Sequence, residues 1–376
     1  MNKFAPTLKR YIQDNYTDYK ADLFSVFMHR NFDFCKPNGY SAFMTPFVWM
    51  FIKSYEKLRQ EIIQTKCIST LIQLEYSAFE EATVPICTFV LRNSALNYKG
   101  NYLRLSDFKG GMDVQNEMVL KAQEDPACKY RYTAQQDNFS KIPGAPVAYW
   151  VSEKMLAVFQ CTKLNKIADP KVGLQTGEND RFTRLWHEVA TERLCLHASS
   201  RDDALKSNCR WFPYNKGGDF RKWYGNNDCV VNWEKDGYGI RHFYDEKGKL
   251  RSRPQNMDTY FKESITWSKI SSGIMAFRYK PYGHVYDVAG TSIFAEHDML
   301  MYLQGFCNSC IAMAIAKILS PTINYEVGHI ANFPIKQVSN SVESTIDKIV
   351  EDSIAISKYD WDCSETSWDF KKHSMI

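Results

Sequence analysis

The 376-residue sequence predicts an α/β fold: the closing part of an α/β domain, then a mixed α/β body, then a C-terminal helix. Apolar residues recur at helical spacing over 22–34 and 53–64, and a strand-like run at 40–47 lies between these segments. No Gly-rich turn of the kind that opens a nucleotide-type α/β domain precedes Tyr40. We therefore expect the chain to begin partway through a domain.

The first hundred residues predict their elements in a clear order. The helix at 22–34 ends at the sequence KPNG, because Pro and Gly do not continue a helix. The run at 40–47 is expected to be a buried strand, and 53–64 an amphipathic helix. Two strand-like runs, 68–76 and 84–93, are joined by SAFEEAT and predict an antiparallel pair.

Beyond residue 98 the pattern changes twice. Residues 99–146 are polar and carry Gly and Pro, which favours a linker or loop-rich bridge. Short segments with dense turns follow up to 335, interrupted by one helix at 298–319, and a last helix covers about 341–357. The predicted division is therefore 1–105, a linker at 106–146, a body at 147–335, and an acidic helix and tail at 336–376.

The charge of the chain is unevenly distributed. The net charge is only +4, but residues 343–369 hold eight acidic residues and two lysines, a net of −6. A basic body with an acidic tail fits a polyanionic partner, whereas a solvated acidic helix is the simpler alternative. The eleven cysteines are scattered, the N-terminus has no apolar signal core, and the longest apolar run is too short for a bilayer, so we expect a cytoplasmic protein.

Two segments combine aromatic rings with positive charge. The first, 211–241, holds six Trp and Tyr side chains near Lys216, Arg221 and Lys222. The second, 247–256, has the sequence KGKLRSRPQN. Cations neutralise phosphates, and rings can stack on bases, so the pair favours a nucleic-acid surface. The structural alternative is an aromatic hairpin corner with solvated lysines.

Other motifs are less specific. Arg181 and Arg184 lie three residues apart at an expected helix start, which suits phosphate binding, although a capped surface helix explains them equally. The strands expected at 264–273 and 287–294 enter Ser/Gly turns and can be purely structural. Cys307 and Cys310 lie in an apolar helical run without a second pair, so we predict no metal site.

Several long motifs together resemble the PglX family, the adenine-specific DNA methyltransferases of the BREX phage-defence systems. They are DLFSVFMHRNFDFCKPNGYSAFMTPFVWMFIKSYEKLR, IPGAPVAYWVSEK, GLQTGENDRFTRLWHEV, WFPYNKGGDFRKWYGNN, LRSRPQNMDTYFKESITWSKISSG, SPTINYEVGHIANFPI and YDWDCSETSWDF. The similarity runs along essentially the whole chain. Family proteins are much longer, and this sequence resembles their C-terminal portion, after the place of the Asn-Pro-Pro-Tyr motif.

The resemblance implies the C-terminal half of a class I, Rossmann-like methyltransferase domain followed by a target-recognition region. Family enzymes move a methyl group from S-adenosylmethionine to the exocyclic amine of adenine in duplex DNA, after the base leaves the stack. The resemblance places Phe79 where a ring stacks on the flipped base, with Tyr76 as the alternative. Because the cofactor loop and Asn-Pro-Pro-Tyr are absent, the chain alone is expected to be inactive and to lack the cofactor site.

The resemblance also assigns DNA contacts within the recognition region. Phosphates are expected at Lys216, Arg221 and Lys222. Base readers are expected among Arg251, Arg253, Gln255 and Asn256, and further DNA contacts at Arg181, Arg184 and Lys269. The expected partners are duplex DNA, a polypeptide carrying the missing N-terminal half, and other phage-defence proteins. The alternatives are a non-catalytic DNA-recognition module of the defence system and a decayed remnant.

Overall fold

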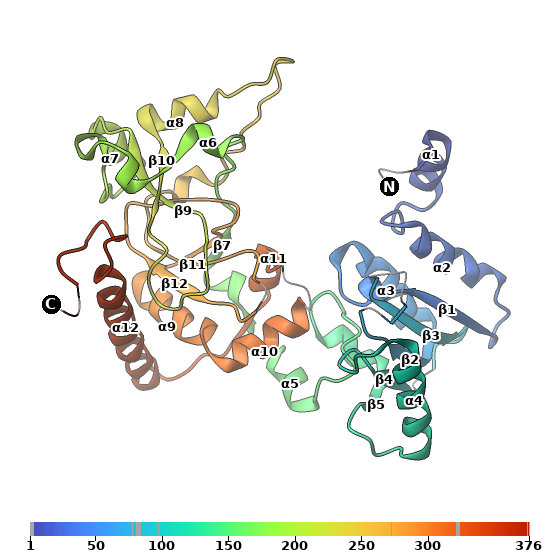
Figure 1. Ribbon diagram of the computed structural model, residues 1–376. Coiled ribbons are helices and arrows are strands. Elements are labelled where there is room, and N and C mark those ends of the chain that lie inside the picture. Colours follow the sequence, from blue (N-terminus) through green and yellow to red (C-terminus); the bar gives the residue numbers. More distant parts are fainter. Residues whose placement is uncertain are drawn as a thin grey trace. The chain divides into compact units, whose positions relative to one another are not determined.

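The computed structural model divides into two compact units, Met1–Gln160 and Cys161–Ile376 (Figure 1). The structure describes residues 4–76, 78–79, 84–96, 98–271, 273–320, 324–373 and 375. Unit 1 has one sheet and unit 2 has three, and each unit has its own hydrophobic core.

Unit 1 alternates helices and strands. Its helices are α1 (Pro6–Asn15), α2 (Leu23–Phe34), α3 (Glu56–Thr65), α4 (Gly111–Glu124) and α5 (Glu153–Val158). Its strands are β1 (Tyr40–Pro46), β2 (Cys67–Gln73), β3 (Ile86–Arg92), β4 (Lys99–Arg104) and β5 (Arg131–Gln135). Three short 3-10 helices join them: η1 (Phe47–Met50), η2 (Lys53–Tyr55) and η3 (Gln136–Lys141).

The five strands form one sheet in the order β1-β3-β2-β4-β5. Strand β3 lies between β1 and β2 and is antiparallel to both, so β1 and β2 run in the same direction. Strand β4 is parallel to β2 and antiparallel to β5. The antiparallel pair predicted from 68–76 and 84–93 is therefore confirmed.

Helices cover both faces of this sheet, because alternate residues of each strand point to opposite sides. Leu71 of β2 and Phe89 of β3 share a core with α2 and α3. Their neighbours Ile72 and Ile86 pack in a second cluster with Met118 of α4. Unit 1 is thus a three-layer α/β/α arrangement, in keeping with the α/β prediction.

Strand β1 is an edge strand, whereas we expected the run at 40–47 to be buried. Among the described strands only β3 pairs with it, and the side chains of Tyr40 and Met44 are exposed. The apolar sequence of 40–47 did not distinguish the two cases, because the same residues suit a buried strand and an edge strand with one covered face.

The linker interpretation of 99–146 is wrong. Strands β4 and β5 extend the sheet, and α4 packs on one face of it. The segment looks polar because β5 is the other edge strand and α4 buries little beyond Gln115 and Ala122. Few buried positions leave a weak apolar period, so the sequence resembled a loop.

Unit 2 is built from many short elements, as the mixed α/β expectation required. Its helices are α6 (Asn179–Phe182), α7 (Arg201–Lys206), α8 (Glu234–Arg241), α9 (His297–Cys307), α10 (Cys310–Leu319), α11 (Val327–Ile330) and α12 (Asn340–Asp362). Its 3-10 helices are η4 (Leu164–Lys166), η5 (Trp186–Glu188), η6 (Thr191–Arg193) and η7 (Met257–Thr259).

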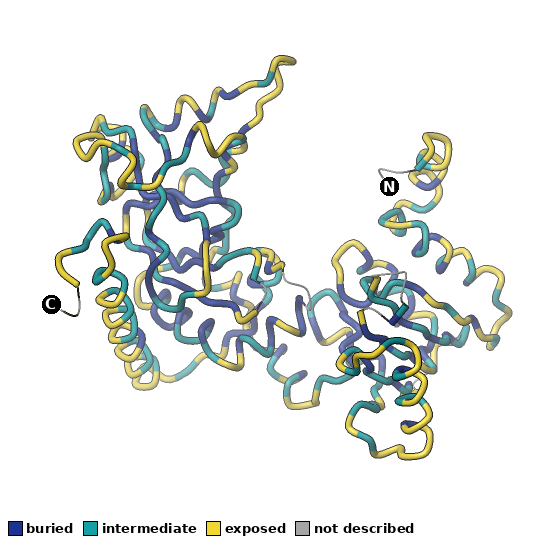
Figure 2. The backbone as a smooth tube through the Cα atoms, viewed as in Figure 1, coloured by how far each residue is buried: buried dark blue, intermediate teal, exposed yellow. Residues whose placement is uncertain are grey.

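The strands of unit 2 form three sheets. The first has the order β13 (Val285–Tyr286), β9 (Trp211–Asn215), β10 (Cys229–Asn232) and β8 (Thr183–Leu185). The second has the order β12 (Phe277–Lys280), β11 (Ser264–Trp267), β14 (Ser292–Phe294) and β7 (Asp169–Lys171). The third pairs β15 (Pro334–Ile335) with β6 (Thr162–Lys163). Strands β9, β11 and β14 are buried along their whole length and form much of the interior of the unit, dark blue in Figure 2.

The single helix predicted over 298–319 is two helices, α9 and α10, bent by 77° at the break between them. At this break the side chain of Asn308 forms two hydrogen bonds with the backbone of Phe277. Its Oδ1 accepts from Phe277 N and its Nδ2 donates to Phe277 O, each at 3.0 Å. Ser309 then caps the second helix by accepting from the backbone N of Ala312. In the described residues no single helix is long and apolar enough to cross a membrane, and only this bent pair meets that test jointly.

The C-terminal helix α12 extends from 340 to 362, longer than the predicted 341–357. It packs on α9 through Gly305, where an added Cβ would lie 3.0 Å from the side chains of Ile346 and Val350. Its outer face is exposed, yellow in Figure 2. Glu351, Asp352 and Asp360 of this helix are exposed, and its other three acidic residues are half-buried, so the solvated acidic helix describes it in part.

A buried arginine joins three segments of unit 1. Arg59 of α3 is 1% exposed and donates to the backbone oxygens of Trp49 and Ile52 at 2.7 and 2.8 Å. It also donates to Gly144 and Ala145, on the segment that closes the unit. Burial lowers its pKa to about 10, which leaves it charged at neutral pH. One cation thus satisfies four carbonyl groups, one at the end of η1 and three, of Ile52, Gly144 and Ala145, that lie in no regular element.

Replacing this cation should weaken unit 1 selectively. We expect Arg59→Leu to lower the free energy of unfolding of this unit by about 2–5 kcal/mol, because four buried carbonyls lose their donor. Chemical denaturation followed by tryptophan fluorescence measures it. Lys57→Leu, an exposed position on the same helix, is the matched control and should change little. Equal effects of the two variants would contradict the structural role of Arg59.

Candidate nucleic-acid interface

The loop at 216–228 connects β9 to β10 and is held against strand β12. The backbone N of Trp223 donates to Phe277 O at 2.9 Å, and Tyr279 N donates to Trp223 O at 2.7 Å. Gln304 of α9 also donates to Trp223 O. The loop therefore continues the edge of the second sheet instead of projecting freely.

Two buried cations of β12 hold this loop by hydrogen bonds to its backbone oxygens. Lys280 is 1% exposed and donates to Gly225 O, Asn226 O and Asn227 Oδ1. Arg278 donates to Arg221 O at 3.3 Å and to Ser268 Oγ at 3.1 Å. Burial lowers the pKa of both side chains, that of Arg278 to about 10. Sequence reasoning missed both residues, because cations in FRYK look like the solvated face of a strand.

The aromatic rings of 211–241 are mostly core residues, which corrects the interpretation of this stretch as a surface. All five residues of β9 are buried, and so are Tyr224 and Trp233. Phe212 and Tyr214 pack in one cluster with Phe261 and Trp233. The rings of β9 therefore belong to the core of unit 2, and the cations Lys216, Arg221 and Lys222 follow in the loop after this strand.

The three cations expected to hold phosphates differ in their surroundings. Arg221 donates to Asp360 Oδ2 of α12 at 2.7 Å and lies over the ring of Trp361. Lys222 donates to Asn308 O at 2.9 Å, at the end of α9. Lys216 is half-buried, and its charge opposes the raised pKa values that burial gives Cys229 and Asp287. Two of the three thus already serve contacts within unit 2.

A second group of cations is brought together around one ring. Arg181 and Arg251 both lie over Phe243, with guanidinium carbons 4.8 and 4.7 Å from the ring centroid. Arg251 also forms an ion pair with Glu178 at 3.4 Å. Arg253 follows two residues later, is exposed, and pairs through its backbone with Gln175. We call Arg181, Arg251 and Arg253 the arginine cluster.

The remaining predicted DNA contacts lie close to backbone or acidic partners. Gln255 donates to Gly173 O and Asn256 donates to Val172 O, at 3.2 and 2.8 Å. Arg184 donates to Asp180 O and Thr183 O, its own neighbours in the chain. Lys269 forms an ion pair with Glu326 at 3.0 Å. These side chains have structural bonds, and their contacts with DNA stay predictions.

Phe79 lies in unit 1, on the connection between β2 and β3. Its side chain is partly buried and packs with Leu74, Leu105 and Phe108. Tyr76 is 60% exposed. Glu75 anchors this connection, because its Oε1 accepts from the backbone N of Gly110 and of Gly111 at 3.1 and 2.6 Å, at the start of α4. Both rings stay candidates for base stacking.

The residues of unit 1 do not fit an S-adenosylmethionine site, the cofactor that the methyltransferase family uses. Such a site needs a glycine turn after a strand, so that the backbone can approach the ligand. Residues 1–99 contain one glycine, Gly39, and it precedes β1. Strands β1 and β3 lead directly into a 3-10 helix and a bend. In the described residues there is also no group of three or more His, Cys, Asp or Glu suited to a metal.

The fold is a mixed α/β fold shared with restriction-modification enzymes. It is similar to the type IIL restriction-modification enzyme MmeI in complex with DNA, with a TM-score of 0.57 and 10% identity over 98% of this chain and 49% of that one. The DrdV–DNA complex gives a TM-score of 0.53 and 10% identity over 94% and 42%. A family model described as Eco57I restriction-modification methylase matches residues 1–79.

Sequence comparison then confirms the resemblance to PglX along the whole chain. The sequence is 37% identical over 383 residues to the adenine-specific methyltransferase PglX of Lacticaseibacillus casei (strain Zhang), covering 100% of this chain and 31% of that protein. It is 34% identical to the adenine-specific methyltransferase BrxX of Escherichia coli O9:H4 (strain HS), covering 98% and 29%. The chain thus spans about three tenths of the length of these relatives.

A buried histidine near Lys280 predicts how unit 2 responds to acid. Burial lowers the pKa of His284 to about 3, and the unfolded side chain titrates near 6.5. Between these pH values the unfolded state binds the extra proton, so stability falls as pH decreases from 6.5 towards 3. We expect His284→Met to reduce the slope of unfolding free energy against pH by up to about 1.4 kcal/mol per pH unit.

Denaturant titrations of unit 2 between pH 6.5 and 4 measure this slope. Carboxylates titrate in the same range, so the comparison is made with His242→Met, which removes an exposed histidine of the same unit. A slope that His284→Met leaves at the wild-type value would show that His284 does not titrate as described.

Proposed function

We propose that this chain is the C-terminal part of an adenine-specific DNA methyltransferase of a phage-defence system. In this proposal unit 1 completes the methyltransferase domain and offers a ring to the flipped base, and unit 2 binds the DNA duplex. The observation that carries it is 37% identity over the entire chain to an adenine-specific methyltransferase. The family match to a restriction-modification methylase over residues 1–79 supports the role of unit 1.

The sheet of unit 1 supports a completing role. Strand β3 runs antiparallel between two parallel strands, which suits the closing part of a class I methyltransferase sheet. The outer edge of β1 carries unpaired backbone groups, and such an edge is a template for another strand. Exposed Tyr40 and Met44 on β1, with Phe27 and Phe34 on α2, add apolar surface beside it. We propose that the cofactor-binding half docks there.

The chemistry left to this chain is positioning. When bound to the other half, S-adenosylmethionine supplies the methyl group. Phe79 or Tyr76 would present a ring to the face of the extruded adenine, which loses stacking when it leaves the duplex. The bonds of Glu75 to Gly110 and Gly111 hold the start of this connection against α4. The ring is thereby tied to a packed part of the unit.

The arginine cluster is the strongest candidate for phosphate contacts in unit 2. Arg181 and Arg253 are exposed, and no ion pair involves either of them in the described part of the chain. Arg221 and Lys222, in contrast, hold α12 and the end of α9. An exposed guanidinium group without an ion pair can contact a phosphate without breaking bonds that hold the fold. We therefore propose that the arginine cluster makes the main electrostatic contact with the DNA backbone.

Reconstitution tests the proposed function. The chain is purified and mixed with a separate polypeptide carrying the N-terminal part of the Lacticaseibacillus casei relative up to its region of similarity. Transfer of labelled methyl groups to adenines in duplex DNA is then measured. Activity that requires both polypeptides supports the proposal. DNA binding without methylation, even when the two polypeptides form a complex, would favour a non-catalytic DNA-recognition module.

The role of the stacking ring has its own prediction. In the reconstituted pair, Phe79→Ala should lower the methylation rate by roughly tenfold or more, because stacking on a base contributes about 1–3 kcal/mol. Duplex binding, measured by fluorescence anisotropy, should stay within about twofold, because unit 2 holds the phosphates. Tyr76→Ala is compared directly, and Tyr98→Ala removes another exposed ring of unit 1 as the control. Equal losses of binding and methylation would assign Phe79 to the core.

The arginine cluster predicts a salt signature. Arg181→Ala combined with Arg253→Ala should weaken binding to all duplex sequences and reduce the slope of log K against log salt by about 0.9 for each phosphate that the variant no longer neutralises. Lys121→Ala combined with Lys129→Ala removes the same charge from unit 1 and is the matched control. A changed sequence preference with an unchanged salt slope would mean that the cluster contacts bases.

A further inference from the structure

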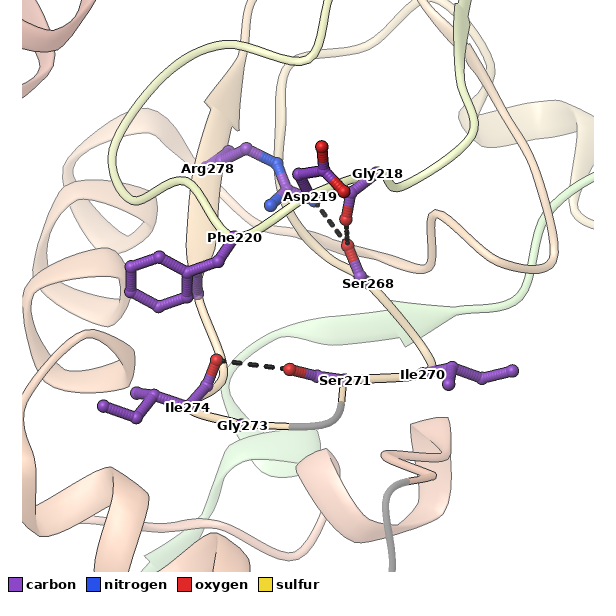
Figure 3. A pocket seen from close by; sticks show the side chains of 10 residues that line it. Gly218, Asp219, Phe220, Ser268, Ile270, Ser271, Gly273, Ile274 and Arg278 are labelled. Atoms are coloured by element: carbon purple, nitrogen blue, oxygen red, sulfur yellow. Dashed lines mark hydrogen bonds between the residues drawn. The ribbon is translucent and has the colours of Figure 1, made fainter.

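A pocket of about 380 Å³ lies between the loop at 216–228 and the turn that joins β11 to β12 (Figure 3). Ser268 and Arg278 lie on one side of it, and the turn that carries Ser271 and Ile274 lies on the other. None of the DNA contacts predicted from the sequence lines it. Its lining combines two features that rarely occur together on a surface.

The first feature is an apolar rim. Phe220, Ile270 and Ile274 are 61%, 62% and 55% exposed, although each is a large hydrophobic side chain. All three line the same pocket. Single exposed hydrophobic residues are ordinary, but a group of them around a hollow marks a surface that binds a partner with apolar faces.

The second feature is a polar floor built around a buried cation. Arg278 is 1% exposed, and it has no ion-pair partner in the described residues. Of its five N–H groups, two donate to Arg221 O and Ser268 Oγ, and Nε has no partner. Asp219 also lines the pocket and supplies a carboxylate acceptor. The lining of the cavity therefore includes a guanidinium group, a hydroxyl group and a carboxylate.

The walls of the pocket are fixed by direct bonds. Ser268 Oγ donates to Gly218 O at 2.9 Å, which ties the loop to the end of β11. Gly218 has φ +114°, and an added Cβ would lie 2.8 Å from the side chain of Asn226. Lys280 holds the other end of the loop. The cavity is thus preorganised by the same buried cations that position the loop.

These features select among ligands that DNA can provide. A backbone phosphate would lie beside the Asp219 carboxylate and would leave the apolar rim uncovered. An aliphatic ligand would leave the donors of Arg278 unused. A nucleobase has two apolar faces, and its edge carries both acceptors and donors, so it matches the rim and the floor together.

We propose that this pocket binds a nucleobase that has left the stack of the DNA. The proposal rests on the proposed function of unit 2 as a DNA-binding unit. Phe220 and the isoleucines contact the faces of the base, and Arg278 with Asp219 contacts its edge. When one base of a pair is extruded, the base opposite to it is left unpaired. Binding in this pocket would hold that unpaired base away from the duplex.

The test uses the whole chain and two duplexes of one sequence, one fully paired and one with a single unpaired thymine. Thymine is chosen because it has carbonyl acceptors and an N–H donor and is not the base that the family methylates. Anisotropy measures the two Kd values. We expect roughly tenfold tighter binding of the duplex with the unpaired thymine.

Two exposed rim positions are varied separately. Phe220→Ala and Ile270→Ala should each reduce this preference, Phe220→Ala by roughly fivefold or more, and leave binding of the paired duplex unchanged. Tyr238→Ala, a ring that is 60% exposed elsewhere in unit 2, is the control and should keep the preference. Arg278 is not varied, because its removal would also release the loop.

A photo-crosslink locates the base. With 5-iodouracil in place of the unpaired thymine, we expect cross-linked peptides from 218–220 or 268–278. Equal affinity for the two duplexes, or cross-links confined to unit 1, would overturn the pocket proposal and leave the proposed function standing. Failure of the chain to bind either duplex would overturn both.

Discussion

The burial of Arg278 and Lys280 on strand β12 is the constraint on which the candidate interface depends. A buried cation without donor-to-oxygen bonds is very unfavourable, so each must find acceptors. The loop at 216–228 supplies them through Arg221 O, Gly225 O and Asn226 O. The loop has no regular structure of its own, and its position is therefore set by the strand beneath it.

Unit 1 has a similar arrangement, in which the buried cation Arg59 bonds to backbone oxygens. Its guanidinium group collects carbonyls from the segment around Trp49 and from Gly144 and Ala145. In both units a cation bonded to backbone oxygens replaces the hydrogen-bond ladder that a helix or strand would give. This solution suits proteins in which irregular segments must be held in one conformation beside a ligand.

The sequence predicted the elements whose apolar period is strong. The helices α2 and α3 each bury one face, and the residues of β3 alternate between buried and half-buried positions. It failed for β4, α4 and β5, where few side chains are buried, and for the rings of β9, where neighbouring cations suggested a surface. Sequence proximity does not show which side of the chain a residue faces. Arg278 is buried and Phe220 is exposed, the reverse of what is usual for these residue types, and only the tertiary structure reveals it.

The predicted DNA contacts fall into two groups: side chains that are bonded within unit 2 and side chains that are exposed and free of ion pairs in the described residues. Lys222, Gln255 and Asn256 donate to backbone oxygens of unit 2, so their replacement would disturb the fold as well as any contact with DNA. Arg181 and Arg253 are exposed and can turn towards phosphates at little structural cost. The sequence alone did not show which of these polar side chains are already bonded within the fold. Their hydrogen bonds distinguish the side chains that build the surface from Arg181 and Arg253, which remain available on it for the proposed contact with DNA.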